Sequence, residues 1–304
     1  MKQVEERYIS LLTDFGFKRI FGTAMNKDLL ICFLNSLFNG RQVVKDVSYL
    51  NPEHVGDVYT DRRAIFDVYC EGENGEKFIV EMQNAYQAYF KDRSLFYSTF
   101  PIREQAPKGN DWDFKLNHVY TVALLNFNMN EDAFDKEKIR HHVQLCDTAT
   151  HKIFYDKLEF IYVEIAKFNK TLEELETLYE KWLYALKNLY KLTQRPKELC
   201  DKVFDRLFEE AEIAKFTPQE LREYEASKKA YRDIKNSIDT AKQEGLAEGM
   251  ELGMKKGMKK GMEKGKNERS LEIAKTMLSD GVDINLIMKY SGLTQEQIDK
   301  LKLK

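Results

Sequence analysis

Two short runs of β-branched and aromatic residues, at residues 65–70 and 78–83, constrain the fold of this 304-residue chain more than any other feature. A polar link that contains Gly72, Asn74 and Gly75 joins them. Runs of this composition on either side of such a link predict a β-hairpin. Because side chains alternate between the two faces of a strand, the register of the hairpin decides which side chains meet.

Two registers of this hairpin are compatible with the sequence, and they differ in where Asp67 and Glu81 lie. A two-residue turn at Asn74 and Gly75 directs the two carboxylates to opposite faces. A three-residue loop with a left-handed bulge at Gly75 places them directly opposite each other, with Cβ atoms about 5 Å apart. We favour the second register, which also brings Gln83 to the same face.

Two carboxylates held this close repel each other, so the arrangement is favourable mainly when a cation lies between them. Mg²⁺ prefers carboxylate oxygens and keeps several waters, one of which can attack a phosphodiester. The alternative interpretation is a solvent-facing hairpin with scattered acids, because short motifs match by chance at a high rate. On the hairpin alone, the two interpretations stay open.

An aspartate on one strand and Glu81-Met82-Gln83 on the next resemble the PD-(D/E)XK nuclease superfamily. More closely, the chain resembles the Rpn-type recombination-promoting nucleases, which are also described as PD-(D/E)XK family putative transposases. The resemblance spans roughly residues 8–170 and depends on the order and spacing of several segments rather than on one motif. These segments are residues 13–22, 50–53, 66–68, 80–83, 93–97 and 119–127.

The resemblance implies an α/β fold with a restriction-endonuclease-like core, in which helices flank a central mixed sheet, followed by an all-α C-terminal region. It implies a metal-dependent DNA endonuclease in which Asp67 and Glu81 bind Mg²⁺, or alternatively Mn²⁺. The superfamily usually has a lysine where this chain has Gln83, whose amide orients water but carries no charge. The alternatives are a nuclease that acts on RNA and a catalytically inactive DNA-binding or assembly protein on the same core.

Four further residues are assigned to the site. Asp14 and Lys18 lie one helical turn apart, and superfamily nucleases often draw an acid from the first helix, so Asp14 is a candidate for the metal site. The alternative is a surface ion pair between the two. Arg93, with Tyr97 one turn away, is a candidate for gripping the scissile phosphate, together with Lys18. Its alternative role is to tether Asp92 or the edge of the sheet.

Periodicity predicts further helices and strands around the hairpin. Apolar residues at helical spacing predict helices over residues 26–38 and 86–105. Apolar runs predict strands over residues 43–50, 118–127 and 158–165. We divide the chain into a nuclease core at 1–170, a helical extension at 171–241, a linker with a Gly-x-x-x repeat at 242–268, and a three-helix module at 269–304.

Composition and charge set limits on function. The net charge is −2 and 43% of the residues are hydrophobic, so a packed interior is expected and any DNA contact has to come from local basic patches. The four cysteines are scattered, which excludes a zinc ribbon and a disulfide framework. The histidines, including the adjacent His141 and His142, are interpreted as surface residues. Because membrane-span and signal patterns are missing from the sequence, we expect a cytoplasmic protein with no membrane contact.

Glycine recurs at every fourth position from Gly245 to Gly265, with lysines and glutamates in the gaps that exclude a membrane span. Each glycine costs about 1 kcal/mol of helix propensity relative to alanine. The repeat therefore predicts a marginally stable, solvated helical tether. The alternatives are a homo-oligomer that associates through this helical half and a loose contact with a phosphate backbone.

The segment from Ser270 onwards predicts three short helices, at residues 271–278, 284–290 and 298–301. A helix, a turn and a helix at this scale are typical of DNA recognition. The charge of the segment is close to balanced, however, so it lacks the basic surface of most DNA-binding modules. A small protein-contact module is therefore the alternative interpretation.

Overall fold

The structure of the protein is a computed structural model that describes residues 6–54, 64–107, 112–129 and 133–302. The chain divides into two compact units, Met1–Asn236 and Ser237–Lys304. One helix, α6 (Pro218–Ser279), belongs to both units. Each unit is described by itself.

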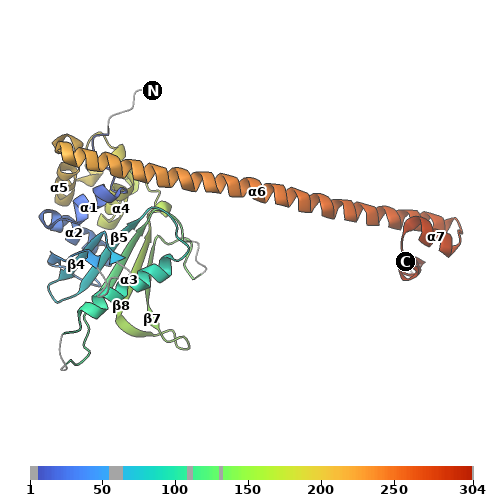
Figure 1. Ribbon diagram of the computed structural model, residues 1–304, viewed down its shortest axis with the longest axis horizontal. Coiled ribbons are helices and arrows are strands. Elements are labelled where there is room, and N and C mark those ends of the chain that lie inside the picture. The colour runs from blue at the N-terminus through green and yellow to red at the C-terminus, as the bar shows by residue number, and fades with distance from the viewer. Residues whose placement is uncertain (1–5, 55–63, 108–111, 130–132, 303–304) are drawn as a thin grey trace. The chain divides into compact units, whose positions relative to one another are not determined.

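The first unit is built on a six-stranded mixed sheet with the strand order β1-β4-β5-β6-β8-β7 (Figure 1). The strands β5, β6 and β8 run parallel to one another, and the remaining neighbours pair antiparallel. The strand bounds are Val47–Tyr49 (β1), Val68–Gly72 (β4), Lys77–Gln83 (β5), Val119–Leu125 (β6), Arg140–Cys146 (β7) and Ile153–Glu164 (β8). Two short strands, β2 (Glu53–His54) and β3 (Ala64–Ile65), form a separate pair.

Helices cover both faces of this sheet (Figure 1). The main core joins one face of the sheet to α1, α2, α4 and α5, while α3 packs on the opposite face. The bounds are Asp14–Phe21 (α1), Lys27–Phe38 (α2), Phe90–Glu104 (α3), Leu178–Asn188 (α4) and Lys202–Glu210 (α5). Short 3₁₀ helices connect these elements at Ala24–Asn26, Ile165–Lys167, Leu172–Glu174, Leu189–Lys191, Lys197–Leu199 and Ile213–Lys215. A mixed sheet flanked by helices and followed by helices confirms the predicted fold class.

The hairpin between β4 and β5 has the favoured register. Val68 pairs with Val80, and the same register continues towards the loop. Gly75 has a φ of 82°, a left-handed conformation that glycine adopts without a steric cost. The N–H of Gly72 donates to the carbonyl oxygen of Glu76 at 2.9 Å, which closes a three-residue loop.

Several predicted elements differ from the structure in length. The strand predicted over residues 43–50 is limited to Val47–Tyr49, because the side-chain amide of Asn35 bonds both backbone polar groups of Val44 at 2.8 Å. The helix predicted over residues 86–105 begins only at Phe90. The strand predicted over 158–165 begins earlier, at Ile153, because it also pairs with β7.

The interpretation of the histidines as surface residues is wrong for His141. It lies on β7, a strand that the sequence did not predict, and its side chain is buried. Its Nε2 atom lies 3.0 Å from a carboxylate oxygen of Glu164. The neighbouring His142 points to the other face of the strand and contacts Glu159. Only the pairing of β7 with β8 reveals these partners.

The second unit contains the rest of α6 and two short helices, α7 (Ile284–Ser291) and α8 (Gln295–Lys302). Ala274, Ile287 and Ile298, one from each helix, form its buried core. The repeated glycines lie inside α6, and the residues between them are exposed. Among the helices that the structure describes, none has the length and apolarity that a bilayer span requires.

Candidate active site

The structure brings Asp67 and Glu81 together at the end of the hairpin. Asp67 immediately precedes β4 and Glu81 lies in β5, and continuing the hairpin register places them opposite each other. The backbone N–H of Asp67 donates to Oε1 of Glu81 at 3.3 Å. In return, the N–H of Met82 donates to Oδ2 of Asp67 at 2.8 Å. Each carboxylate is therefore held by the backbone of the other strand.

Both carboxyl groups are largely shielded from water. Burial, followed by the negative charge of Asp67, raises the pKa of Glu81 to about 8. Burial also raises the pKa of Asp67, although the N–H of Met82 and the charge of Lys18 act in the opposite direction. Two buried carboxyl groups with raised pKa values lack sufficient positive charge nearby. The site is suited to bind either a proton or a metal cation.

Gln83 lies two residues after Glu81 on the same face of β5. Its Nε2 atom donates to Oε2 of Glu81 at 3.2 Å. The carbonyl oxygen of Gln83 accepts a hydrogen bond from the N–H of Asn126 at 2.8 Å, so β6 holds this end of β5 in place. The amide of Gln83 therefore reaches the carboxylates, as the alternation of side chains predicts.

Lys18 connects helix α1 to the carboxylates. Its Nζ atom lies 2.7 Å from Oδ1 of Asp14 and 3.7 Å from Oδ1 of Asp67. Burial alone would lower the pKa of Lys18, but the bond to Asp14 and the nearby acidic charges raise it above its usual range. Asp14 is exposed and forms the ion pair that the sequence left open as its alternative role. It is linked to Asp67 through Lys18.

Arg93 reaches the site from helix α3. One guanidinium nitrogen donates to Oε1 of Gln87 at 2.6 Å, and the group lies over the rings of Phe90 and Tyr97. The other terminal nitrogen, Nη2, is buried and has no hydrogen-bond partner among the described residues. The positive charge of Arg93 opposes the rise in the pKa values of Asp67 and Glu81, although both remain raised. Its bond to Gln87 was not apparent from the sequence.

The donor set restricts which metals fit this site. In the described parts of the chain, no cluster of three or more histidine, cysteine, aspartate or glutamate side chains is arranged to hold a metal ion. Zinc sites usually need three or four such ligands. Mg²⁺ binds through one or two carboxylates and keeps several waters, so Asp67 and Glu81 fit a hard divalent ion of this kind.

Two family models match this chain. No curated protein and no solved structure matches the chain. Residues 267–303 match the model of the C-terminal helix-turn-helix domain of the Rpn/YhgA-like nuclease family, which favours DNA recognition over a protein-contact module. Residues 11–241, most of the chain, match the model of the PD-(D/E)XK nuclease family transposases. The chain therefore belongs to the PD-(D/E)XK nuclease family transposases.

Proposed function

We propose that the protein is a metal-dependent endonuclease that hydrolyses phosphodiester bonds in DNA. The observation that carries this proposal is the adjacent pair of carboxyl groups of Asp67 and Glu81, of which Glu81 is buried and Asp67 is largely shielded. Membership of a nuclease family and a helix-turn-helix match at the C-terminal end also support it. The helix-turn-helix match favours DNA over RNA as the substrate.

Asp67 and Glu81 are the residues that would hold Mg²⁺ or Mn²⁺. A divalent ion at this position supplies Lewis-acid chemistry, which lowers the pKa of water and stabilises negative charge on a phosphodiester. The two carboxylates provide negative charge, and the backbone N–H groups of Asp67 and Met82 fix their orientation. Because the pKa values of both carboxyl groups are raised, binding of a cation would displace a proton from this pair, and the cation would bind more tightly as the pH rises.

Two side chains, those of Arg93 and Lys18, are suited to contact the substrate, and Tyr97 positions one of them. Arg93 has an unpartnered, buried Nη2 donor near the carboxylates, and a phosphate oxygen is a matching acceptor. The ammonium group of Lys18 offers a second positive charge beside Asp67. Tyr97 lies half-buried under the guanidinium of Arg93 and holds it towards the site.

Gln83 would orient the attacking water through its side-chain amide. It has no charge, so it does not replace the lysine that the superfamily usually carries at this position. In this chain Lys18 brings a positive charge to Asp67 from helix α1 instead. Asp14, which contacts Lys18 at 2.7 Å, would control the position of this ammonium group.

The test is the cleavage of supercoiled plasmid DNA by the purified full-length protein with Mg²⁺. We expect Asp67→Ala and Glu81→Ala each to lower the rate at least about 100-fold, because each removes half of the metal-binding charge. Asp156→Ala, which removes an exposed carboxylate on β8, is the matched control and should cleave at the wild-type rate. Unchanged cleavage in Asp67→Ala would contradict the proposal.

A second candidate function is a catalytically inactive protein that binds DNA or assembles with other copies through its helical C-terminal half. The neutral Gln83 at the usual lysine position favours this candidate. Calorimetric titration with Mg²⁺ and Mn²⁺ separates the two functions. An endonuclease should bind either ion in a way that depends on Asp67 and Glu81, whereas an inactive assembly protein should show no such binding.

A further inference from the structure

The first turns of α6 carry three polar side chains on one face. Tyr224, Ser227 and Tyr231 are spaced by three and four residues, so they project from the same side of the helix. All three belong to the first compact unit, and the family match continues to residue 241. The root of α6, residues 218–236, is therefore part of the nuclease region.

Two of these side chains hold the segment that leads into α1. The hydroxyl of Tyr224 accepts a hydrogen bond from the N–H of Ser10 at 3.0 Å. The hydroxyl of Ser227 accepts one from the N–H of Phe15 at 3.0 Å. Phe15 lies in the first turn of α1, where backbone N–H groups have no partner inside the helix. Ser227 thus provides an acceptor for a backbone N–H group at the start of α1, the helix that carries Lys18.

The third side chain, Tyr231, reaches the ends of the two central strands. Its hydroxyl accepts a hydrogen bond from Nδ2 of Asn126 at 3.2 Å. The same nitrogen donates to Oδ1 of Asn84 at 3.4 Å, and Nδ2 of Asn84 donates to the carbonyl oxygen of Leu12 at 2.7 Å. The NH₂ group of Asn126 has two hydrogens, and these two bonds use both.

This chain of amides ends beside the carboxylates. The backbone N–H of Asn126 donates to the carbonyl oxygen of Gln83 at 2.8 Å, and Asn84 is the residue that follows Gln83. A change in the position of Asn126 or Asn84 therefore shifts Gln83, whose side chain bonds Glu81. The hydroxyl of Tyr231 is the group that connects α6 to this chain of amides.

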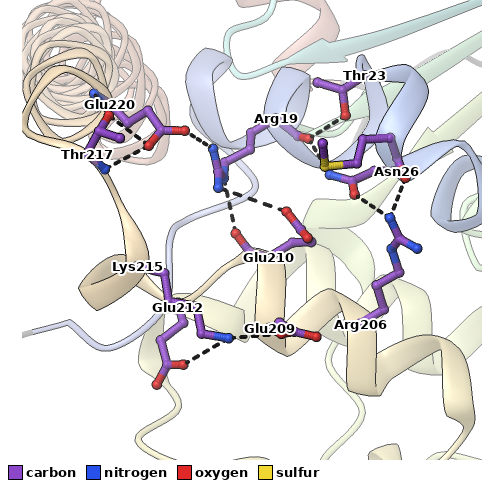
Figure 2. A network of polar contacts seen from close by, with 11 residues as sticks. Arg19, Thr23, Asn26, Arg206, Glu209, Glu210, Glu212, Lys215, Thr217 and Glu220 are labelled. Carbon is purple, nitrogen blue, oxygen red and sulfur yellow. Dashed lines mark hydrogen bonds and ion pairs between the residues drawn. The ribbon is translucent and has the colours of Figure 1, made fainter.

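The attachment of the α6 root does not depend on Tyr231. Figure 2 shows a separate network in which Arg19 pairs with Glu220 at the start of α6 and donates to the carbonyl oxygen of Glu210 at 3.1 Å. Thr217 and Glu220 cap the helix through reciprocal hydrogen bonds. Removal of one hydroxyl at Tyr231 should therefore leave α6 in place and disturb only the amide chain.

We propose that Tyr231 is a positioning residue that sets the place of Gln83 and Glu81 through the side chains of Asn126 and Asn84. This inference rests on the proposed function, because it assigns a role to the geometry of the same site. Tyr231 acts on the chemistry only through its neighbours and does not contact the substrate. The root of α6 is then a working part of the nuclease site as well as the beginning of the helix that continues to the C-terminal unit.

The test is a double-mutant cycle in the full-length protein that combines Tyr231→Phe with Gln83→Leu. Tyr231→Phe should lower kcat for plasmid cleavage about 2- to 10-fold with little change in KM, which is the scale of one lost hydrogen bond. In the Gln83→Leu background, the same substitution should lower kcat less than about 2-fold, because coupled residues are not additive. Tyr184→Phe, at a half-buried tyrosine of α4 outside the proposed site, is the matched control for thermal stability and rate.

Three results would overturn the inference. One is a kcat for Tyr231→Phe equal to that of the wild type. The second is a loss of kcat that is the same in both backgrounds. The third is a loss of kcat that follows a drop in melting temperature that Tyr184→Phe lacks. Each of these results leaves the proposed function intact when the wild type cleaves DNA and Asp67→Ala does not.

Failure of the proposed function gives a different pattern, namely a wild-type protein without Asp67-dependent cleavage. The inference is then judged by Mn²⁺ titration alone, with no nucleic acid present. We expect Tyr231→Phe to weaken Mn²⁺ binding about 2- to 5-fold, because Glu81 is less well placed. An Mn²⁺ affinity equal to that of the wild type, or a wild type that binds no Mn²⁺, would overturn it in this case.

Discussion

Two buried glutamates, Glu81 on β5 and Glu164 on β8, lie near the ends of two parallel strands that β6 separates, and they differ in how the protein neutralises them. Glu164 contacts Lys167 and His141, and it accepts a hydrogen bond from the N–H of Met129. Burial acts to raise its pKa, but Lys167 and these hydrogen bonds hold the pKa below its usual range. Glu81 is also buried, yet the largest charge effect on it comes from another acid, Asp67, and its pKa is raised.

The comparison shows that burial alone does not identify a functional carboxylate. Glu164 has its partners in the fold and acts as a structural ion-pair centre. Glu81 and Asp67, in contrast, have raised pKa values although Lys18 lies 3.7 Å from Asp67 and Arg93 acts on both from α3. A protein retains such a pair at a cost in stability, which is typical of sites that bind a cation.

The largest expected effect is a difference in stability between two matched substitutions. Glu164→Gln should lower the free energy of unfolding by about 3 kcal/mol, because it leaves Lys167 and His141 without their buried anion. Glu81→Gln should leave the free energy unchanged or raise it, because a neutral amide replaces a carboxyl group that the fold keeps protonated at neutral pH at a cost in stability. Urea unfolding at neutral pH without divalent ions measures both. An equal loss in the two variants would remove the distinction between these glutamates.

A smaller effect is expected from divalent ions. Mn²⁺ at 100 times its dissociation constant should stabilise the wild type by about 2.7 kcal/mol, because it binds only the folded carboxylate pair. The gain should disappear in Glu81→Gln and persist in a variant of Glu164 that still folds. Thermal unfolding with and without Mn²⁺ provides the measurement. Stabilisation that survives the loss of Glu81 would place the ion elsewhere.

The smallest effect, measured per pH unit, is the dependence of stability on pH. The folded protein keeps a proton on Glu81 up to about pH 8, whereas the unfolded chain releases it near 4.5. The unfolded state therefore binds fewer protons between these values, and stability should fall as the pH rises through this window, by at most about 1.4 kcal/mol per pH unit. Glu164 has a lowered pKa and therefore has the opposite effect: it makes stability rise with pH, at pH values below the usual pKa of a glutamate. Urea titrations from pH 5 to 9 should show a flatter profile for Glu81→Gln, and an unchanged profile would contradict the assignment.

Much of the hairpin was predictable because its determinants are local. Gly75 supplies the left-handed residue that the three-residue loop needs, and the alternation of strand side chains then brings Asp67 and Glu81 together. The mixed α/β core was also predicted, from apolar runs and from the resemblance to a nuclease family. The burial of His141 was missed, because the polar and irregular strand β7 gives a weak signal in the sequence.

The contacts that complete the site could not be predicted in the same way. The hydrogen bond that Arg93 donates to Gln87 is short-range, but it depends on where the loop before α3 lies. The hydrogen bond between Tyr231 and Asn126 joins residues more than a hundred positions apart. No periodic pattern links such residues, because their meeting depends on the packing of α6 against the rest of the first unit.

The sequence by itself therefore determined the class of fold and the meeting of two acids across one hairpin, since turn chemistry and strand alternation act over a few residues. Only the tertiary structure decided which charges surround those acids. Lys18 and Arg93 come from separate helices, and Tyr231 comes from a third. Their positions follow from how helices pack on the two faces of the sheet, and this packing is a property of the whole core rather than of any short segment.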